Sequence, residues 1–236
     1  MLEGKEAPGG HELFADYFEI IAPAPSGLAS RDTIINDQTL PQTLYDQRHL
    51  VLRNQIPTAV LKVRSAVLTA FRQVYLEDHV TEVTPPCMVQ TQVEGGSTLF
   101  GFKYYGQDAY LTQSSQLYLE TALASLGDVY CIAPSFRAEK SHTRRHLSEY
   151  THIEAELAFL SFDELLTHIE DTICRVIEKV LAMPGISEMI EQCWEDGSKT
   201  YQKFEPEKKH PKQFVAPKRT LQVSLVDNRT VPKDAI

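Results

Sequence analysis

The sequence contains no long apolar run and no recognisable targeting leader. A membrane-spanning helix needs about 18 consecutive apolar residues, and no stretch of the 236 residues approaches that length. The N-terminus, MLEGKEAPGGHELF, has neither an apolar signal core nor an Arg-rich amphipathic character. The sequence therefore predicts a soluble protein of the cytoplasm with no membrane partner.

Cysteine is scarce and widely spaced. The four cysteines lie at positions 87, 131, 174 and 193, and no two of them form a Cys-x-x-Cys pair. This spacing is typical neither of a zinc site nor of a disulfide framework. We expect reduced thiols, most of them buried.

Basic residues are outnumbered by acidic ones. The chain has 23 Lys and Arg against 32 Asp and Glu, which gives a net charge of −9. A protein that coats nucleic acid is normally basic, so we expect no DNA partner. A local basic patch can still bind RNA, because only the charges near the phosphates contribute.

The apolar pattern predicts an α+β chain in which helices flank an antiparallel β-sheet. Residues 57–77 keep one face apolar, and Pro57 suits the first turn of a helix. Residues 161–182 form a second amphipathic helix, and Ser161 with Glu164 has the pattern of a capping box. The other predicted elements are strands 12–22, 81–84, 128–136 and 149–159, a hairpin over 98–112 with its turn at 106–108, and a short helix from Ser114 to about Leu126.

Two segments lack a sustained period. Residues 23–55 are rich in Pro, Asp and Asn and are predicted to be a linker. After Pro184 the apolar pattern decays, and the charged stretch 195–219 is typical of a loop or of disorder. Glycine is also scarce there, since Gly185 and Gly197 are the only glycines after Phe159.

The most informative stretch is FRAEKSHTRRHLSEYTHIEAE, residues 136–156. Its second strand alternates, so that one face carries Tyr150, His152, Glu154 and Glu156. Alternation alone favours a surface that faces solvent. The preceding loop, however, concentrates cationic side chains in the manner of a site for a polyanion such as a triphosphate. These are Arg137, Lys140, Arg144, Arg145 and His146.

This stretch resembles motif 2 of the class II aminoacyl-tRNA synthetases, a strand–loop–strand that holds ATP. The resemblance implies that Arg137 binds the α-phosphate and stabilises charge in the transition state. It implies that Glu139 binds the adenine amino group and that Tyr150 stacks on the adenine ring. It also places His146 at the γ-phosphate and Arg145 in the same ATP-binding group. Each role suits the chemistry of its side chain.

Upstream, the helix at 57–77 followed by TEVTPP resembles motif 1 of the same family. The resemblance implies a homodimer whose interface includes Pro86. An ordinary helix–strand pair in a core would explain the apolar stripe equally well, so that alternative stays open.

Two further stretches resemble the aspartyl and asparaginyl subgroup. QTQVEGGSTLF resembles a mobile loop that closes over the amino acid, with Glu94 beside two flexible glycines. LTQSSQLYLE resembles the amino-acid-binding helix, in which Gln116 contacts the α-amino end of the substrate and Ser114 lies nearby.

Leu119 distinguishes between the two amino acids of this subgroup. Aspartyl enzymes carry a lysine at the corresponding position, where it pairs with the carboxylate of the substrate side chain. Leucine cannot neutralise that charge, and burying a carboxylate without a partner is costly. A neutral amide needs no such partner, so the pattern favours asparagine, with Glu120 and Glu154 as acceptors for its amide or its ammonium.

The resemblance therefore implies ATP-dependent ligation of asparagine to tRNA(Asn) through asparaginyl-adenylate, with ATP and Mg²⁺. It divides the chain into a remnant of an OB-type anticodon-binding domain (1–22), a linker (23–55), a catalytic core with motifs 1 and 2 (56–184) and a divergent tail (185–236). Motif 3 is a Gly-rich segment with an Arg for the γ-phosphate, preceded by acidic Mg²⁺ ligands, and no such segment occurs here. We expect a partial catalytic domain that is inactive alone and holds no metal ligand.

Two alternatives stay open. The chain could be a catalytically inactive fragment or paralogue that serves as a binding or dimerisation module. It could also be an aspartyl-tRNA synthetase or an asparagine-forming enzyme with the same catalytic fold. The predicted strand at 12–22 argues against the asparagine-forming enzyme, which lacks an anticodon domain.

Overall fold

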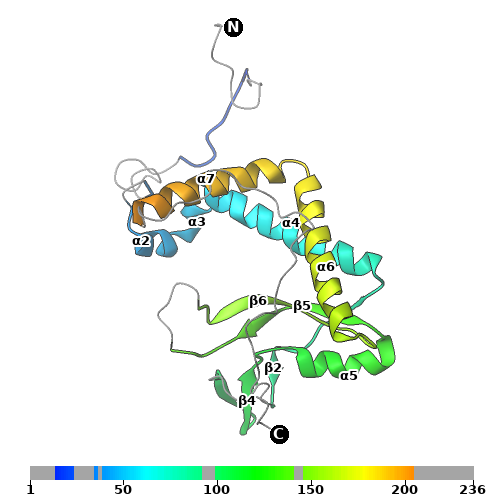
Figure 1. Ribbon diagram of the computed structural model, residues 1–236. Coiled ribbons are helices and arrows are strands. Elements are labelled where there is room, and N and C mark those ends of the chain that lie inside the picture. The colour runs from blue at the N-terminus through cyan, green and yellow to red at the C-terminus, as the bar shows by residue number, and fades with distance from the viewer. Residues whose placement is uncertain (1–13, 24–34, 37–38, 92–98, 141–145, 205–236) are drawn as a thin grey trace. The chain divides into compact units, whose positions relative to one another are not determined.

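The structure is a computed structural model that describes residues 14–23, 35–36, 39–91, 99–140 and 146–204. Its chain forms two compact units, Met1–Pro57 and Thr58–Ile236, whose elements are drawn in Figure 1. Among the described helices, none is long and apolar enough to cross a membrane.

The first unit differs from the predicted strand and linker. Residues 14–23 form no strand, and their large apolar side chains are exposed. A strand must pair its backbone groups, and no described residue offers it a partner. Within the predicted linker, two short helices form, α2 (Pro41–Asp46) and α3 (Arg48–Val51). The assignment of residues 1–22 to an anticodon-binding domain stays a prediction.

Three helices build the main core of the second unit. The predicted helices at 57–77 and 161–182 are confirmed as α4 (Gln55–Glu77) and α6 (Phe162–Ala182), and α7 (Ile186–Phe204) follows them. Their shared core consists of Ala66, Ala70, Val74, Val176, Val180 and Ile186.

The helix α7 corrects the prediction of an irregular segment after Pro184. Its apolar residues lie at helical spacing, and Ile186, Met189 and Ile190 pack in the core shared with α4 and α6. The predicted loop at 195–219 is therefore wrong as far as Phe204, and its remainder lies outside the described residues.

The start of α6 shows the predicted capping box. The Glu164 N–H donates to Ser161 Oγ (3.4 Å), and the Ser161 N–H donates to Glu164 Oε2 (2.7 Å). The Ser161 hydroxyl also donates to Glu164 Oε2 (2.6 Å), and this bond, followed by that from the Ser161 N–H, lowers the pKa of Glu164, because both favour the charged carboxylate.

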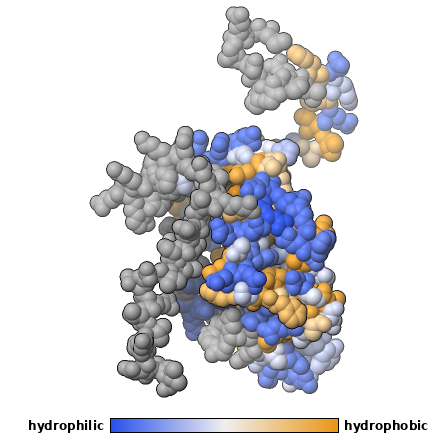
Figure 2. Space-filling model, turned by 45° about the vertical axis from the view of Figure 1, so that its right-hand side comes forward, coloured by the Kyte–Doolittle hydropathy of each residue, from blue (hydrophilic) through white to orange (hydrophobic). Residues whose placement is uncertain are grey.

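Only the C-terminal half of the apolar face of α6 is buried. Val176 and Val180 lie in the core, whereas the N-terminal half remains exposed through Phe162, Leu165, Leu166, Ile169 and Ile173. Apolar patches accordingly interrupt the hydrophilic surface (Figure 2). The sequence pattern identifies this face of the helix correctly, but it does not show how much of the face is covered.

Two small sheets complete the second unit. In the first, β1 (Thr81–Glu82) pairs in parallel with β5 (Val129–Phe136), which pairs antiparallel with β6 (Glu149–Glu156). In the second, β4 (Gln107–Leu111) lies between β2 (Met88–Val89) and β3 (Gly101–Tyr104). The predicted hairpin is thus confirmed, but its turn is centred one residue earlier, on Tyr105 and Gly106, which both have positive φ.

The sheet that contains β5 and β6 packs a helix on each face. On one face, Tyr75 of α4 stacks on Tyr130 of β5, with ring centroids 4.3 Å apart. On the other, α5 (Gln116–Leu126) packs Leu119 against Val129 and Cys131. The predicted fold class, α+β with helices flanking an antiparallel sheet, is confirmed.

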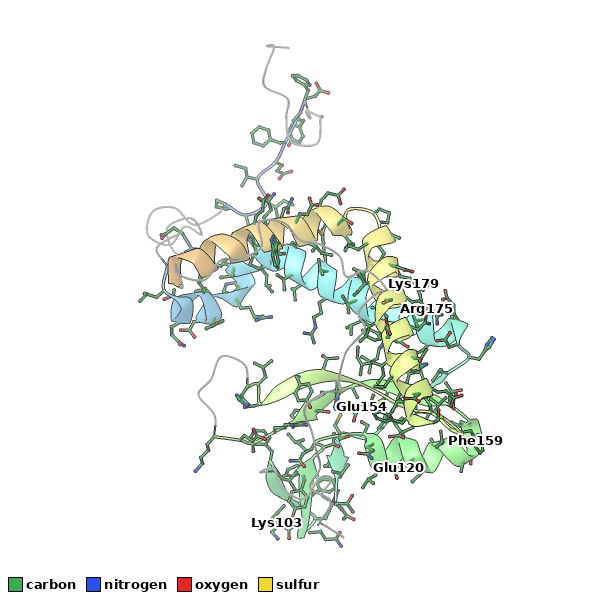
Figure 3. The ribbon with its side chains drawn as sticks, in the orientation of Figure 1. Lys103, Glu120, Glu154, Phe159, Arg175 and Lys179 are labelled. Atoms are coloured by element: carbon green, nitrogen blue, oxygen red, sulfur yellow. The ribbon has the colours of Figure 1, made fainter. Side chains whose placement is uncertain are left out.

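An ion-pair cluster joins the end of α4 to the middle of α6. Arg175 contacts Asp78 (2.7 Å), Glu77 (3.0 Å) and Asp171 (3.2 Å), and Lys179 contacts Glu77 (2.6 Å). Arg175 and Lys179 lie on the same stretch of α6 (Figure 3). The partners raise the pKa of Arg175, Asp78 most of all, and its side chain is only 23% exposed.

Replacing Arg175 by Met should destabilise the chain by about 2 kcal/mol, since it leaves the partly buried Asp78 without its cation. The loss should shrink in high salt, because screening weakens the ion pairs of the parent. Urea denaturation measures both effects. Arg53→Met, at an exposed position, is the matched control, and equal losses in the two variants would show that the cluster does not stabilise the helix pair.

Candidate active site

The polar face of β6 is the framework of the candidate site. The register sets Tyr150 opposite Ser135, His152 opposite Ala133 and Glu154 opposite Cys131. Alternate residues of paired strands share a face, so Tyr150, His152, Glu154 and Glu156 lie on the face against which α5 packs. The predicted alternation of this strand is confirmed, although the strand ends at Glu156 and not at Phe159.

The predicted ATP-binding residues gather at one end of this face. Arg137 directly follows β5, and its N–H donates to the Ser148 carbonyl (3.0 Å). Its guanidinium carbon lies 5.8 Å from the centre of the Tyr150 ring, which is within the range of a cation–π contact. A cavity of about 120 Å³ is lined by Arg137, Glu139, His146, Leu147 and Ser148. Arg145 lies outside the described residues, and the individual roles in ATP binding stay predictions.

Glu154 joins the other end of the face to α5. The Ser115 N–H donates to both of its carboxylate oxygens (3.2 and 3.0 Å), and Ser114 Oγ donates to Oε1. The Glu154 side chain is only 11% exposed. A carboxylate at the N-terminus of a helix is favoured both by its hydrogen bonds and by the helix dipole. Glu154 therefore acts as a cap that β6 supplies to α5.

The first turns of α5 carry the other predicted amino-acid-binding groups. The Gln116 N–H donates to Ser114 Oγ (3.1 Å), and Gln116 Nε2 donates to Glu120 Oε1 (3.0 Å). Glu120 and Glu154 are labelled in Figure 3, on α5 and β6. The structure thus brings Ser114, Gln116, Glu120 and Glu154 together.

Negative charge accumulates between α5 and the end of β6. Burial raises the pKa of Glu156 above its ordinary value of 4.5, and the nearby charges of Glu120 and Glu154 raise it further. Both burial and neighbouring negative charge disfavour the charged form of a carboxyl group, and therefore raise its pKa. The region would therefore favour a bound cation and disfavour a further anion.

Leu119 has a different environment from the one that a substrate contact requires. It is fully buried, and it packs against Val129 and Cys131 between α5 and β5. In this structure it is a core residue, so a direct contact with an amino acid stays a prediction. Its apolar character is explained by packing alone.

Pro86 and Glu94 are the remaining predicted residues. Pro86 lines a second cavity, of about 210 Å³, that Ser114, Ser115 and Tyr118 also border. Its role in a dimer stays a prediction. Glu94 lies in the segment 92–98, outside the described residues.

The sequence pattern assigns no role to three polar groups of this face. Ser115 acts through its backbone N–H, His152 lies 3.3 Å from Glu154, and Ser135 lies 3.1 Å from His152. The alternation of β6 places His152 on the polar face but does not show its contacts. Ser135 and Ser115 become visible only when the register of β5 with β6 and the position of α5 are known.

No metal site is found in the part of the chain that the structure describes. There, no group of three or more His, Cys, Asp or Glu side chains is arranged to hold a metal ion. We therefore assign no described residue to Mg²⁺.

Comparisons with known proteins show which proteins this chain resembles. Residues 41–219 match the family described as tRNA synthetases class II (D, K and N). The chain is 64% identical over 190 residues to the cytoplasmic asparagine–tRNA ligase of Saccharomyces cerevisiae, covering 80% of this chain and 34% of that protein. It is 53% identical over 183 residues to the human cytoplasmic asparagine–tRNA ligase, covering 78% and 33% of the two chains.

Solved structures show the same similarity. The asparaginyl-tRNA synthetase from Pyrococcus horikoshii complexed with asparaginyl-adenylate superposes with a TM-score of 0.71 at 38% identity, covering 78% of this chain and 41% of that one. An asparaginyl-tRNA synthetase from Entamoeba histolytica in complex with asparaginyl-adenylate gives a TM-score of 0.61 at 41% identity, covering 77% and 38%. The chain spans about a third of the length of the curated relatives it matches.

Replacing Glu156 by Gln should stabilise the chain at neutral pH. Because the folded pKa lies above that of the unfolded chain, the stabilising contribution of Glu156 is complete only below about pH 4.5. It is lost as the pH rises through the raised pKa. We expect Glu156→Gln to be more stable than the parent at about pH 7 and the difference to fall near pH 4. Urea denaturation at both pH values measures this, with the exposed Glu170→Gln as control. A difference that does not depend on pH would contradict it.

Replacing Leu119 by Lys should destabilise the chain by roughly 3–5 kcal/mol, because it buries an ammonium among apolar side chains. Leu119→Met, which keeps the volume, should cost less than about 1.5 kcal/mol. Equal stability of the two variants would show that this position opens to solvent, which would support its predicted contact with the substrate.

Proposed function

This chain belongs to the class II tRNA synthetases of the D, K and N group, and on that basis we propose that it acts in the ATP-dependent ligation of asparagine to tRNA(Asn). The reaction passes through asparaginyl-adenylate, the compound bound in the two related structures. ATP, asparagine and tRNA(Asn) are its partners, and the cytoplasm is its compartment, as the names of the relatives suggest.

One observation carries the proposal: the two ends of the polar face of β6 differ in charge, and each end suits a different substrate. We call them the nucleotide half-site and the amino-acid half-site. At one end of β6, Arg137 lies over Tyr150 beside a cavity that Glu139 and His146 line. At the other, Glu154 is bonded to the first residues of α5. A cationic end suits the phosphates of a nucleotide, and an anionic end suits the ammonium of an amino acid.

The chemistry is mainly the positioning of reactants and the stabilisation of charge. A carboxylate oxygen of asparagine attacks the α-phosphorus of ATP, and pyrophosphate leaves. Arg137 binds the α-phosphate and stabilises the negative charge that develops there. A terminal ribose hydroxyl of the tRNA then attacks the carbonyl carbon of the adenylate, and AMP leaves.

The charge around α5 supports asparagine over aspartate. Three carboxylates lie in this region, and burial together with the charges of Glu120 and Glu154 raises the pKa of Glu156. The side-chain carboxylate of aspartate would add a further negative charge, whereas the amide of asparagine adds none. The ammonium common to both amino acids is attracted in either case.

Mg²⁺ and a second subunit belong to the proposal as well. Mg²⁺ would neutralise phosphate charge during the first step. The homodimer would form through the segment that contains Pro86.

A catalytically inactive binding or dimerisation module is the second candidate. The observation in its favour is that no stretch of the 236 residues resembles a Gly-rich motif 3. Such a module would keep the fold and the subunit contact and would lack the complete phosphate site.

Asparagine-dependent exchange of pyrophosphate into ATP tests the proposal. We expect exchange with a full-length relative and none with the 236-residue chain, which should bind ATP only weakly. Lacking one charge-assisted pair to the γ-phosphate should weaken ATP binding by about 1.5–3 kcal/mol. Isothermal titration measures the ATP affinity.

Arg137→Gln should weaken the remaining ATP binding further, whereas the control Arg53→Gln should not. Tight ATP binding, or exchange at an ordinary enzymatic rate by the 236-residue chain, would show that its phosphate site is complete. A stable dimer that binds neither ATP nor asparagine would favour the inactive module.

A further inference from the structure

His152 lies between two polar groups on the face shared by β5 and β6. Its Nδ1 is 3.3 Å from Glu154 Oε2 and 3.1 Å from Ser135 Oγ. The imidazole is 30% exposed, and Ser135 is fully buried. The same ring lies 5.3 Å from the centre of the Tyr150 ring. His152 therefore links the nucleotide end of the site to the amino-acid end.

The position of the carboxylate determines which nitrogen of His152 carries hydrogen. A bare Nδ1 would place its lone pair 3.3 Å from the negatively charged Glu154 oxygen, which is repulsive. With hydrogen on Nδ1, the ring can donate to Ser135 Oγ, and the positive end of the N–H dipole lies near the Glu154 carboxylate, which attracts it. The geometry therefore favours the form of the imidazole that is protonated on Nδ1.

The Glu154 carboxylate in turn determines where α5 begins. The Ser115 side chain accepts no capping bond from the described part of the chain, and the first turn of α5 has no acidic residue. The cap is supplied across 39 positions of sequence, from Glu154 to the Ser115 N–H. Gln116 is the first residue of that turn, and Glu120 begins the next.

We propose that His152 is a positioning residue, whose Nδ1–H holds the Glu154 carboxylate against the N-terminus of α5. It thereby fixes Gln116 and Glu120 in the orientation that the amino acid requires. The first part of this proposal concerns the free chain alone, and only its last step rests on the proposed function.

Nitrogen NMR of the ¹⁵N-labelled 236-residue chain tests the first part without any ligand. The spectrum is recorded near pH 8.5, well above the ordinary imidazole pKa of about 6.5. We expect the Nδ1–H tautomer of His152 in the parent and in Ser135→Ala, and a shift towards the Nε2–H tautomer in Glu154→Ala. His168 on α6 serves as the internal control. A predominant Nε2–H tautomer in the parent would overturn the proposal.

Amide exchange at Ser115 tests whether His152 fixes the cap. His152→Leu removes the donor, and His152→Asn restores a side-chain N–H near the position of Nδ1. We expect about tenfold faster exchange in the Leu variant, as the loss of one polar contact to a charged group implies, and recovery in the Asn variant. His168→Leu is the matched control. Unchanged exchange in the Leu variant, or no recovery in the Asn variant, would contradict the proposal.

Asparagine titration tests the last step. The Leu variant should bind asparagine about tenfold more weakly than the parent, with recovery in the Asn variant and little change in ATP affinity. Equal asparagine affinity in parent and Leu variant would overturn this step. If the parent itself binds no asparagine, the proposed function fails for this chain, while the tautomer and exchange results still decide whether His152 positions Glu154.

Discussion

The antiparallel pairing of β5 with β6 is the constraint on which the rest of the second unit depends. Its register places the polar residues of β6 opposite small side chains of β5, such as Ala133, Cys131 and Ser135. Small residues leave room for α5 above that face, whereas Tyr130 on the opposite face stacks on Tyr75 of α4. A slip of one residue would exchange the two faces, which would bury Glu154 against α4 and turn Ile153 towards α5.

Local patterns in the sequence predict most of this architecture. The helix α4, the capping box of Ser161 with Glu164 and the alternation of β6 each depend on residues a few positions apart, and each is confirmed. The failures have a common cause in long-range packing. Residues 14–23 have a strand-like pattern but no described partner, and α7 is helical because Ile186 and Met189 pack on α4 and α6 although its later residues are charged and include Gly197.

The candidate site likewise contains contacts that short-range sequence patterns predict and contacts that they do not. Arg137, Glu139, His146 and Tyr150 lie on one strand–loop–strand, so their proximity follows from a short stretch of sequence. The bonds from Ser114 and Ser115 to Glu154 join segments 39 and 40 positions apart, which no periodicity reveals. Leu119 shows a second limit of the sequence pattern. Its apolar character is consistent both with a substrate contact and with the buried position that the structure gives it.

Along the polar face of β6, positive charge lies at one end and negative charge at the other. Arg137 lies beside Tyr150, and four residues further along the strand Glu154 lies among carboxylates, a separation of roughly 13 Å at the rise of an extended strand. An aminoacyl-adenylate carries its charges in the same order, with an anionic phosphate near the nucleotide and a cationic ammonium at the amino acid. A strand is well suited to hold such a ligand, because its backbone is paired on β5 and its side chains stand at fixed intervals.

His152 occupies the interval between the two charged ends, where one imidazole contacts the ring of Tyr150 and the carboxylate of Glu154. The orientation of α5 therefore depends on the same strand that carries Tyr150, so that the two ends of this face are joined through one pair of strands.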